Sequence, residues 1–198
     1  MTARMVFLNG PPSVGKSSIA RSLQLCLDEP FFRLDLDEFL RGYSPRWWTT
    51  APGQQLFPMV VNAWLLALRD LGRTGNSVIA PTMIASTLGN VERHVELFAE
   101  FTVYLVGVTC PLELAQQRER SRDDRDHPLD LNVPLYRALH RELDLASAYD
   151  LQIDTSTMTS KEAASQVIAL LRDVANPQAF ARIARQATPR PQRQPDPG

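Results

Sequence analysis

Apolar residues follow two different periods along the chain. Short continuous apolar runs alternate with longer segments in which apolar residues recur at helical spacing, which is typical of buried strands and of amphipathic helices respectively. The predicted strands are 4–9, 31–34, 77–80, 102–108 and 151–154, and the predicted helices are 16–27, 54–71, 90–100, 112–120, 134–146 and 160–175. Because strands that alternate with helices need crossover connections, the pattern predicts an α/β fold with a mainly parallel sheet and helices on both faces.

Several boundaries of these elements have a local cause. Residues 159–162, Thr-Ser-Lys-Glu, have the pattern of a capping box that begins a helix. Pro134 suits the first turn of its helix, where a backbone N–H has no intrahelical partner to lose. Gly72 and Gly75 are placed to end the third helix and to turn the chain into the next strand.

The last residues differ in composition from the rest of the chain. They combine prolines with glutamine and arginine, and the prolines are Pro177, Pro189, Pro191, Pro195 and Pro197. Phe180 and Ile183 extend the last helix briefly, and disorder is expected beyond Ala187 because few apolar residues there can offset the entropy of ordering. The sequence therefore predicts one domain over 1–175 and a Pro/Arg-rich, largely disordered tail over 176–198.

Composition narrows the classes of partner. The 198 residues carry a formal net charge of -1, and no basic run dominates the predicted domain, which argues against long nucleic acid as a partner. Cys26 and Cys110 are too few and too far apart for a disulfide framework or a structural zinc site, so a reducing cytoplasm is expected. The start of the chain lacks the layout of a signal peptide, and the longest apolar run, 103–110, is too short to cross a bilayer. Nothing in the sequence indicates an oligomeric state.

One loop carries a specific phosphate-binding pattern. Residues 10–17, Gly-Pro-Pro-Ser-Val-Gly-Lys-Ser, fit G-x-x-x-x-G-K-[ST] between a predicted strand and a predicted amphipathic helix. In that pattern the curled backbone points its N–H groups at phosphate oxygens, Lys16 places a cation on the β- and γ-phosphates, and the Ser17 hydroxyl ligates Mg²⁺. The predicted nucleotide-binding residues are Gly10, Pro11, Pro12, Ser13, Val14, Gly15, Lys16, Ser17 and Ser18. The alternative is a simple turn with a helix-capping serine.

Two carboxylates follow the second predicted strand. If strand geometry continues through Asp35 and Asp37, their side chains point to the same face, at the carboxyl edge where open α/β sheets bind ligands. Phosphoryl transfer to an alcohol needs a carboxylate that orients the hydroxyl and accepts its proton, and Asp37 is the candidate. Asp35 is a candidate for Mg²⁺ and acceptor binding. For both residues the alternative is helix capping.

Six segments in the same order resemble chloramphenicol phosphotransferase and its relatives. They are 4–10, 13–17, Glu29-Pro30 leading to Asp37, 106–108 followed by Cys110, Arg118-Glu119 with Asp124-Arg125, and Tyr149-Asp150 leading to Asp154-Thr155. The resemblance covers about residues 1–175. It implies an ATP-dependent kinase with the P-loop NTPase three-layer sandwich of adenylate-kinase-like proteins, a five-stranded parallel sheet, and the catalytic aspartate at Asp37. The Asp-x-Asp arrangement is also similar to that of shikimate kinases.

The chain departs from these relatives at the end of its third strand. Relatives carry an acidic residue there that supports Mg²⁺, whereas this chain has Ala80, Pro81 and Thr82. Three possibilities stay open: Asp35 and Asp37 support the metal, Mg²⁺ is held mainly by Ser17, phosphates and water, or catalysis is impaired.

An arginine-rich segment follows the fourth strand. Arg118, Arg122 and Arg125 share one face of a helix because they are four and three residues apart. The resemblance places this segment at a lid, where guanidinium groups stabilise the transferring phosphoryl group and water is excluded. Arg118 and Arg122 are therefore candidate catalytic residues, and Arg125 is a candidate nucleotide-binding residue. The alternative is a solvated helix with Arg–Asp pairs.

The acceptor site is predicted from a long, weakly patterned connection. Trp47 and Trp48 lie there beside other aromatic residues, and Met83 follows the third strand. Clustered aromatic side chains form walls for flat or apolar ligands, and equally they cover a sheet edge as a satellite core.

These observations give one leading hypothesis and several rivals. The leading one is an ATP- and Mg²⁺-dependent O-phosphotransferase for a small hydroxyl-bearing molecule, with chloramphenicol as a candidate acceptor through the resemblance and a metabolic alcohol as another. One rival is a nucleotide-binding module with weak or no turnover. Another is a kinase for nucleic-acid ends, which the lack of a basic groove opposes. The sequence does not separate ATP from GTP.

Overall fold

The computed structural model describes residues 3–48, 50–121, 131–144 and 149–187. Its centre is a parallel sheet of five strands in the order β2-β3-β1-β4-β5. The strands are β1 (Arg4–Asn9), β2 (Phe31–Arg33), β3 (Ser77–Thr82), β4 (Thr102–Thr109) and β5 (Leu151–Asp154). The five-stranded parallel sheet is confirmed, and each strand lies where the apolar runs predict it.

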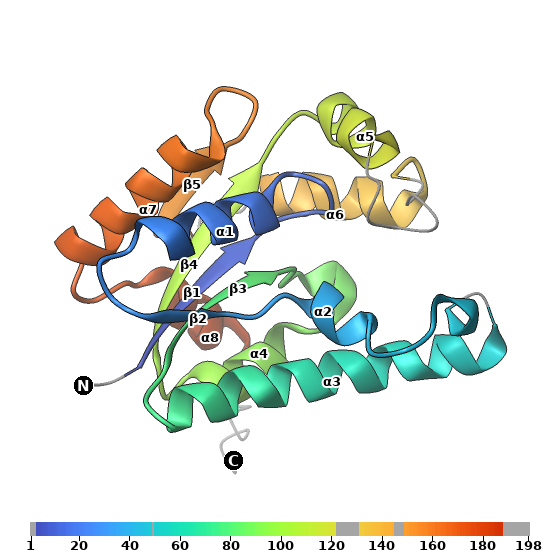
Figure 1. Cartoon of the computed structure of the whole chain (residues 1–198), viewed down its shortest axis with the longest axis horizontal. Coiled ribbons are helices and arrows are strands. Elements are labelled where there is room, and N and C mark those ends of the chain that lie inside the picture. The colour runs from blue at the N-terminus through green and yellow to red at the C-terminus, as the bar shows by residue number, and fades with distance from the viewer. Residues whose placement is uncertain (1–2, 49, 122–130, 145–148, 188–198) are drawn as a thin grey trace, which may run out of the picture.

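Helices cover both faces of this sheet (Figure 1). They are α1 (Lys16–Cys26), α2 (Leu36–Leu40), α3 (Ala51–Arg73), α4 (Val91–Phe98), α5 (Leu112–Arg120), α6 (Pro134–Asp144), α7 (Ser160–Asp173) and α8 (Ala179–Ala187), with short 3₁₀ turns at η1 (Pro45–Trp47) and η2 (Ser86–Leu88). Helices α1 and α7 pack on one face, and α3, α4 and α8 pack on the other. The predicted three-layer sandwich is confirmed.

Strand β1 shows how the sequence builds two cores from one strand. Val6 and Leu8 face the layer of α1 and α7, and Met5 and Phe7 face the layer of α3, α4 and α8. All four side chains are fully buried. Side chains alternate between the faces of a strand, so a strand that is covered on both faces reads as one continuous apolar run.

Two helix boundaries have the chemistry that the sequence predicts. The Thr159 hydroxyl accepts a hydrogen bond from the Glu162 N–H, and the Glu162 carboxylate accepts one from the Thr159 N–H, which completes the capping box of α7. At the end of α3, Gly75 adopts a left-handed φ of 92°. The Gly75 and Asn76 N–H groups bond to the carbonyls of Gly72 and Leu71, which is a Schellman motif.

Pro81 lies inside β3 without breaking the sheet. The Ile79 carbonyl accepts from Leu34 on the β2 side, and the Thr82 carbonyl accepts from Gly10 on the β1 side. Backbone groups alternate in direction along a strand, so the nitrogen of Pro81 faces β2 beyond the point where β2 ends at Arg33. A proline there removes no ladder hydrogen bond.

The chain after β2 differs from the prediction. Strand geometry does not continue through the two aspartates, because β2 ends at Arg33 and α2 begins at Leu36. Asp35 is the N-cap residue of α2 and Asp37 lies in its first turn. The condition for both carboxylates to point to the same face is therefore not met, because Asp35 is still extended whereas Asp37 is already helical.

Helix α8 begins after residue 175, where the sequence predicts the tail to start, and it packs on the layer of α3 and α4. Ala179 and Phe180 are buried against the layer of α3 and α4, and the Phe180 ring packs edge-on against Phe7. Asp150 secures the start of α8, because its carboxylate accepts hydrogen bonds at 2.9 Å from the Gln178 and Ala179 N–H groups and also from the Leu105 N–H in β4. The predicted tail beyond Ala187 lies outside the described residues.

We predict that Asp150→Ala detaches α8 from the sheet. Three backbone N–H groups lose their charged acceptor, so the free energy of unfolding should fall by about 2 kcal/mol. Urea unfolding measures this loss, and amide hydrogen exchange should show the largest increase within α8. Asp173→Ala, which truncates an exposed aspartate at the end of α7, is the matched control. Equal stability of both variants would contradict the prediction.

Candidate functional site

The phosphate loop connects β1 to α1 at the carboxyl edge of the sheet. A Cβ atom on Gly10 would lie 2.1 Å from the carbonyl oxygen of Val108 in β4, so only glycine allows the loop to start this close to the neighbouring strand. The Gly10 N–H bonds to the Thr82 carbonyl at 3.4 Å. These two contacts fix the first residue of the loop between β3 and β4.

Two positive φ angles curl the backbone of this loop. Gly15 has a φ of 100° and is the N-cap residue of α1. Ser13 has a φ of 63°, the one left-handed value at a residue other than glycine in the described part of the chain. A helix N-terminus that follows such a curl presents its N–H groups and its partial positive charge to an anion. The loop therefore has a backbone geometry that suits an anion, and phosphate binding stays a prediction.

The side chain of Lys16 lies across the phosphate loop. Its ammonium group donates to the Gly10 and Pro11 carbonyls at 2.8 and 2.6 Å. Both carbonyls belong to the phosphate loop itself, so the cation is held at the concave region where a polyphosphate would bind. Ser17 follows at the first turn of α1 and is half-buried, whereas Ser18 is exposed.

Helix α5 contacts the phosphate loop from the side of β5. The Arg118 guanidinium donates to the Thr155 hydroxyl at 2.7 Å, to the Thr155 carbonyl at 2.8 Å and to the Val14 carbonyl at 3.4 Å. The Thr155 hydroxyl also donates to Val14 at 2.7 Å. Arg118 therefore joins the phosphate loop to the turn after β5. Arg122 and Arg125, the other arginines predicted on this face, lie outside the described residues.

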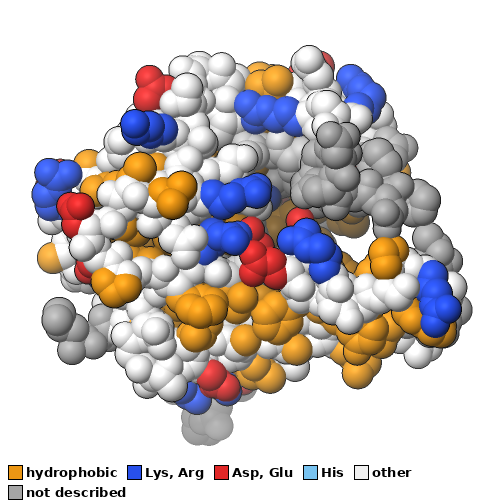
Figure 2. Space-filling model, in the orientation of Figure 1, with side chains coloured by type: hydrophobic (Ala, Val, Ile, Leu, Met, Phe, Trp, Pro, Cys, Tyr) orange, Lys and Arg blue, Asp and Glu red, His pale blue; other side chains and the backbone are white. Residues whose placement is uncertain are grey.

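A cluster of acidic and basic side chains lies at the start of α2. Arg33 forms ion pairs with Asp35 and with Glu38, the latter at 2.8 Å. Figure 2 shows acidic and basic side chains gathered near the centre of this face, over α1 and α2. Burial raises the pKa of the Asp35 carboxyl above its usual value, and the nearby guanidinium of Arg33 opposes that rise. Asp35 makes no capping hydrogen bond to α2, which removes the capping alternative for its side chain.

Residues for a Mg²⁺ ion are present but few. The described residues contain no group of three or more His, Cys, Asp or Glu that could hold a metal ion by itself. One oxygen of Asp35 is buried and has no hydrogen-bond partner among the described residues, which suits a water ligand of a hard cation. Burial raises the pKa of Asp35 overall, and Arg21 of α1, which donates to the Ser17 carbonyl, is the weakest of the charges that act on this carboxyl. Ser17 and Asp35 fit an ion that keeps most of its waters and binds phosphate oxygens.

The buried side-chain amide of Asn9 connects the end of β1 to the turn after β3 and to Tyr149. Asn9, the last residue of β1, accepts a hydrogen bond from the Ile84 N–H at 2.6 Å and donates to the Ile84 carbonyl and to the Tyr149 hydroxyl, both at 3.1 Å. Tyr149 reaches this position because Gly107 has no side chain; a Cβ there would lie 2.3 Å from the tyrosine ring. The sequence did not point to this network, since the signal is a single asparagine at a strand end.

The predicted acceptor residues occupy two separate places. Trp47 lies in η1, 38% exposed, with the Arg46 guanidinium 4.9 Å above its ring, and Trp48 packs edge-on against Tyr43. Met83 is half-buried after β3 and packs beside Leu139 of α6. Asp37 is half-buried in α2, which precedes both of these regions along the chain.

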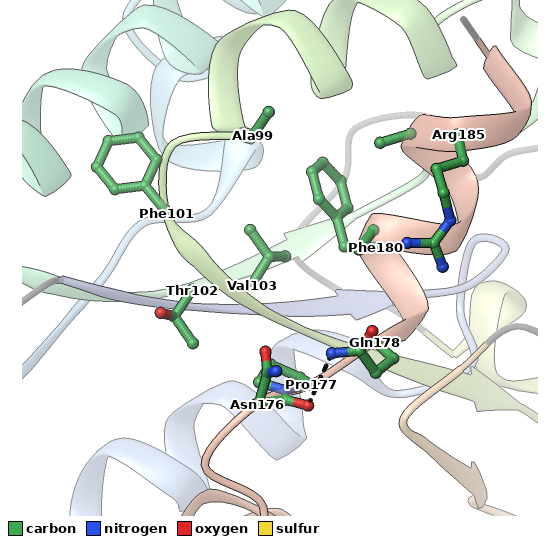
Figure 3. A pocket seen from close by; sticks show the side chains of 11 residues that line it. Ala99, Phe101, Thr102, Val103, Asn176, Pro177, Gln178, Phe180 and Arg185 are labelled. Carbon is green, nitrogen blue, oxygen red and sulfur yellow. Dashed lines mark hydrogen bonds between the residues drawn. The ribbon is translucent and has the colours of Figure 1, made fainter.

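A hollow elsewhere on the molecule is separate from this edge. It has a volume of about 350 Å³ and lies between the amino end of β4 and α8, lined by Phe101, Val103, Pro177, Phe180 and Arg185 among others (Figure 3). Parallel strands place the phosphate loop at their carboxyl ends, so this hollow lies at the opposite edge of the sheet.

Comparison with known proteins decides the family. The sequence profile of chloramphenicol phosphotransferase-like proteins matches residues 3–172, which is most of the chain. The chain belongs to this family. A search of curated proteins found no match.

Solved structures show the same fold for this family member. A Deinococcus radiodurans tunicamycin resistance protein matches with a TM-score of 0.59 and 24% identity over 85% of this chain and 95% of that one. A shikimate kinase from Acinetobacter baumannii, solved with shikimate, gives 0.62 and 21% over 88% and 96%. A Mycobacterium tuberculosis APS kinase, solved with AMPPNP and APS, gives 0.55 and 19% over 86% and 98%. The neighbours include P-loop small-molecule kinases, which agrees with the family.

None of the helices that the structure describes is long and apolar enough for a membrane span.

The turn after β3 is held to α6 by one carboxylate, which gives a test of pH dependence. Glu142 accepts hydrogen bonds from the Ser86 and Thr87 N–H groups at 2.5 and 3.0 Å. Burial alone would raise the pKa of Glu142, but these hydrogen bonds outweigh it and the net shift is downward from 4.5. A carboxylate with a lowered pKa in the folded state stabilises that state at higher pH.

We predict that Glu142→Gln lowers the free energy of unfolding at pH 7 and that its difference from the unmodified protein shrinks in acid. The contribution is complete above the unfolded pKa and is lost as pH falls through the lower folded pKa, so the two curves should converge below about pH 4. Urea unfolding from pH 3 to 7 measures the difference. Glu96→Gln, at an exposed position on α4, should show no such convergence. A constant difference across the range would refute the role of the Glu142 charge.

Proposed function

We propose that this protein is an ATP-dependent O-phosphotransferase that moves the γ-phosphoryl group of ATP to a hydroxyl of a small molecule. The observation that carries the proposal is the curled loop from Gly10 to Ser17, with the Lys16 ammonium held across it. Membership of the chloramphenicol phosphotransferase-like family supports the reaction class. A phosphate loop alone is shared by many nucleotide-binding proteins, so the family and the carboxylates at the start of α2 narrow the proposal to kinases.

The nucleotide would bind along the line from the loop to the turn after β5. Backbone N–H groups of residues 13–18 would face the phosphates, and Lys16 would exchange its carbonyl partners for β- and γ-phosphate oxygens. Arg118 lies between Val14 and Thr155, on the side of the loop away from α2. We therefore assign Arg118 to nucleotide binding as well as to charge stabilisation. When bound, Mg²⁺ supplies charge neutralisation at the phosphates, and Ser17 with Asp35 would hold it.

The acceptor would bind on the side of α2. Asp37 is the proposed base: it would orient the acceptor hydroxyl and take its proton as the phosphoryl group arrives. Trp47, Trp48 and Met83 are the proposed walls for an apolar or aromatic acceptor. An antibiotic such as chloramphenicol is one candidate acceptor, and a metabolic alcohol is another, because pocket residues vary among proteins that share this fold. Arg122 and Arg125 remain proposed lid residues.

One observation favours a second candidate function. The end of β3 carries Pro81 and a buried Thr82 where relatives place an acidic residue, so the support of Mg²⁺ depends on fewer groups. A nucleotide-binding module with weak or no turnover would have the same loop and the same fold. Binding without transfer to any acceptor would support this candidate over the kinase.

We predict that Lys16→Ala weakens ATP binding at least about tenfold, because a charged hydrogen-bond donor to the phosphates is lost. Titration calorimetry with ATP–Mg²⁺ measures the dissociation constant. Lys161→Ala, which removes the exposed lysine in the first turn of α7, is the control and should bind as the unmodified protein does. Undiminished affinity in Lys16→Ala would remove the phosphate loop from the proposal.

We predict that Asp37→Asn keeps ATP binding but lowers the rate of transfer about 10²- to 10⁴-fold, because the amide cannot take up the proton of the acceptor. ADP release across a panel of alcohols that includes chloramphenicol and shikimate identifies the acceptor, and the variant is then tested with that acceptor. Asp28→Asn, at an exposed position outside the site, is the control. An unchanged transfer rate in Asp37→Asn would remove Asp37 from its role.

A further inference from the structure

A buried carboxylate on α5 is not explained by the function proposed above. Glu119 is 1% exposed and lies one turn after the fully buried Ala115, so it occupies a core position of its helix. A carboxylate at such a position costs free energy unless hydrogen bonds replace its water. The Ser13 hydroxyl supplies one of them, because it donates to Glu119 Oε2.

The partner of Glu119 is the strained residue of the phosphate loop. Ser13 has a φ of 63°, which an L-residue adopts at a cost that glycine would not incur. Its side chain is held by α5 while its backbone N–H belongs to the region that would face a phosphate. A second contact joins the residues adjacent to this pair: Arg118, which precedes Glu119, donates to the carbonyl of Val14, which follows Ser13. Two neighbouring residues of α5 thus hold two neighbouring residues of the loop.

We propose that Glu119 is a positioning residue of the phosphate loop. Its carboxylate holds Ser13 in the left-handed conformation and so presets the curl of the loop before a polyphosphate binds. Without this hydrogen bond the loop would populate other conformations, and the apparent affinity would fall with the fraction of molecules that keep the binding-competent one. The proposal rests on the proposed function, because it concerns the same loop and its phosphate ligand.

The test is a double-mutant cycle on the full chain, read out by calorimetric titration with inorganic tripolyphosphate and with ATP. Ser13→Ala removes the hydroxyl and should weaken both ligands about tenfold. Glu119→Ala should weaken them by a similar factor, and the double variant should be no weaker than the weaker single variant. Glu119→Gln should restore most of the affinity, since its amide oxygen still accepts from Ser13. Glu113→Gln, at an exposed position of α5, is the matched control.

Stability is measured in parallel as the melting temperature of each variant. If Glu119→Ala does not fold, Glu119→Met takes its place in the cycle, because methionine fills the site without an acceptor. Ser13→Ala affinity within about twofold of the unmodified protein, or additive effects of the two residues, would overturn the proposal. A loss of melting temperature without a loss of affinity would overturn it as well. If the unmodified protein binds neither ligand, the proposed function fails together with this one; if it binds both, only the positioning role is at stake.

Discussion

The close approach of the backbone at Gly10 to β4 is the constraint on which the site depends. A side chain at this residue would lie 2.1 Å from the Val108 carbonyl oxygen, so the loop could not begin between β3 and β4 if any other residue stood there. The chain must then reverse within five residues and enter α1 with its N–H groups exposed, which the left-handed angles at Ser13 and Gly15 accomplish. The proposed phosphate binding, the position of Lys16 and the docking of α5 all depend on this turn.

The sheet explains why distant residues meet at this loop. Five parallel strands place all their carboxyl ends at one edge, so the end of β1, the turn after β3 and the turn after β5 lie around the same region. Asn9 links the first two of these, and Thr155 with Arg118 links the loop to the third. Strand β2 affects the site because it is short. It ends before it would pair with Pro81, and the chain then forms α2, which carries Asp37.

The sequence predicted the layers and the phosphate loop because their signals are local. An apolar run such as 4–9, a Gly-Lys-Ser loop and a capping box at Thr159 each need only a few adjacent residues. Strand geometry was considered through Asp37 because Leu34, Leu36 and the two aspartates alternate as a strand does, whereas β2 ends at Arg33. The attachment of α8 depends on Asp150, 28 residues before Gln178, and no local pattern announces that contact.

The hydrogen bond between Ser13 and Glu119 is another long-range contact without a local signal, because the two residues are 106 apart in the sequence. The motif leaves the fourth position of the loop unspecified, so a serine there carries no signal, and a glutamate inside an Arg-Glu-Arg segment resembles a solvated helix. Burial separates Glu119 from the exposed Arg120 beside it, and the backbone angle of Ser13 is what gives the loop a use for a partner. Residues that preset a loop act through its conformational equilibrium. Their role is therefore recognised from contacts in the folded protein and not from a sequence motif.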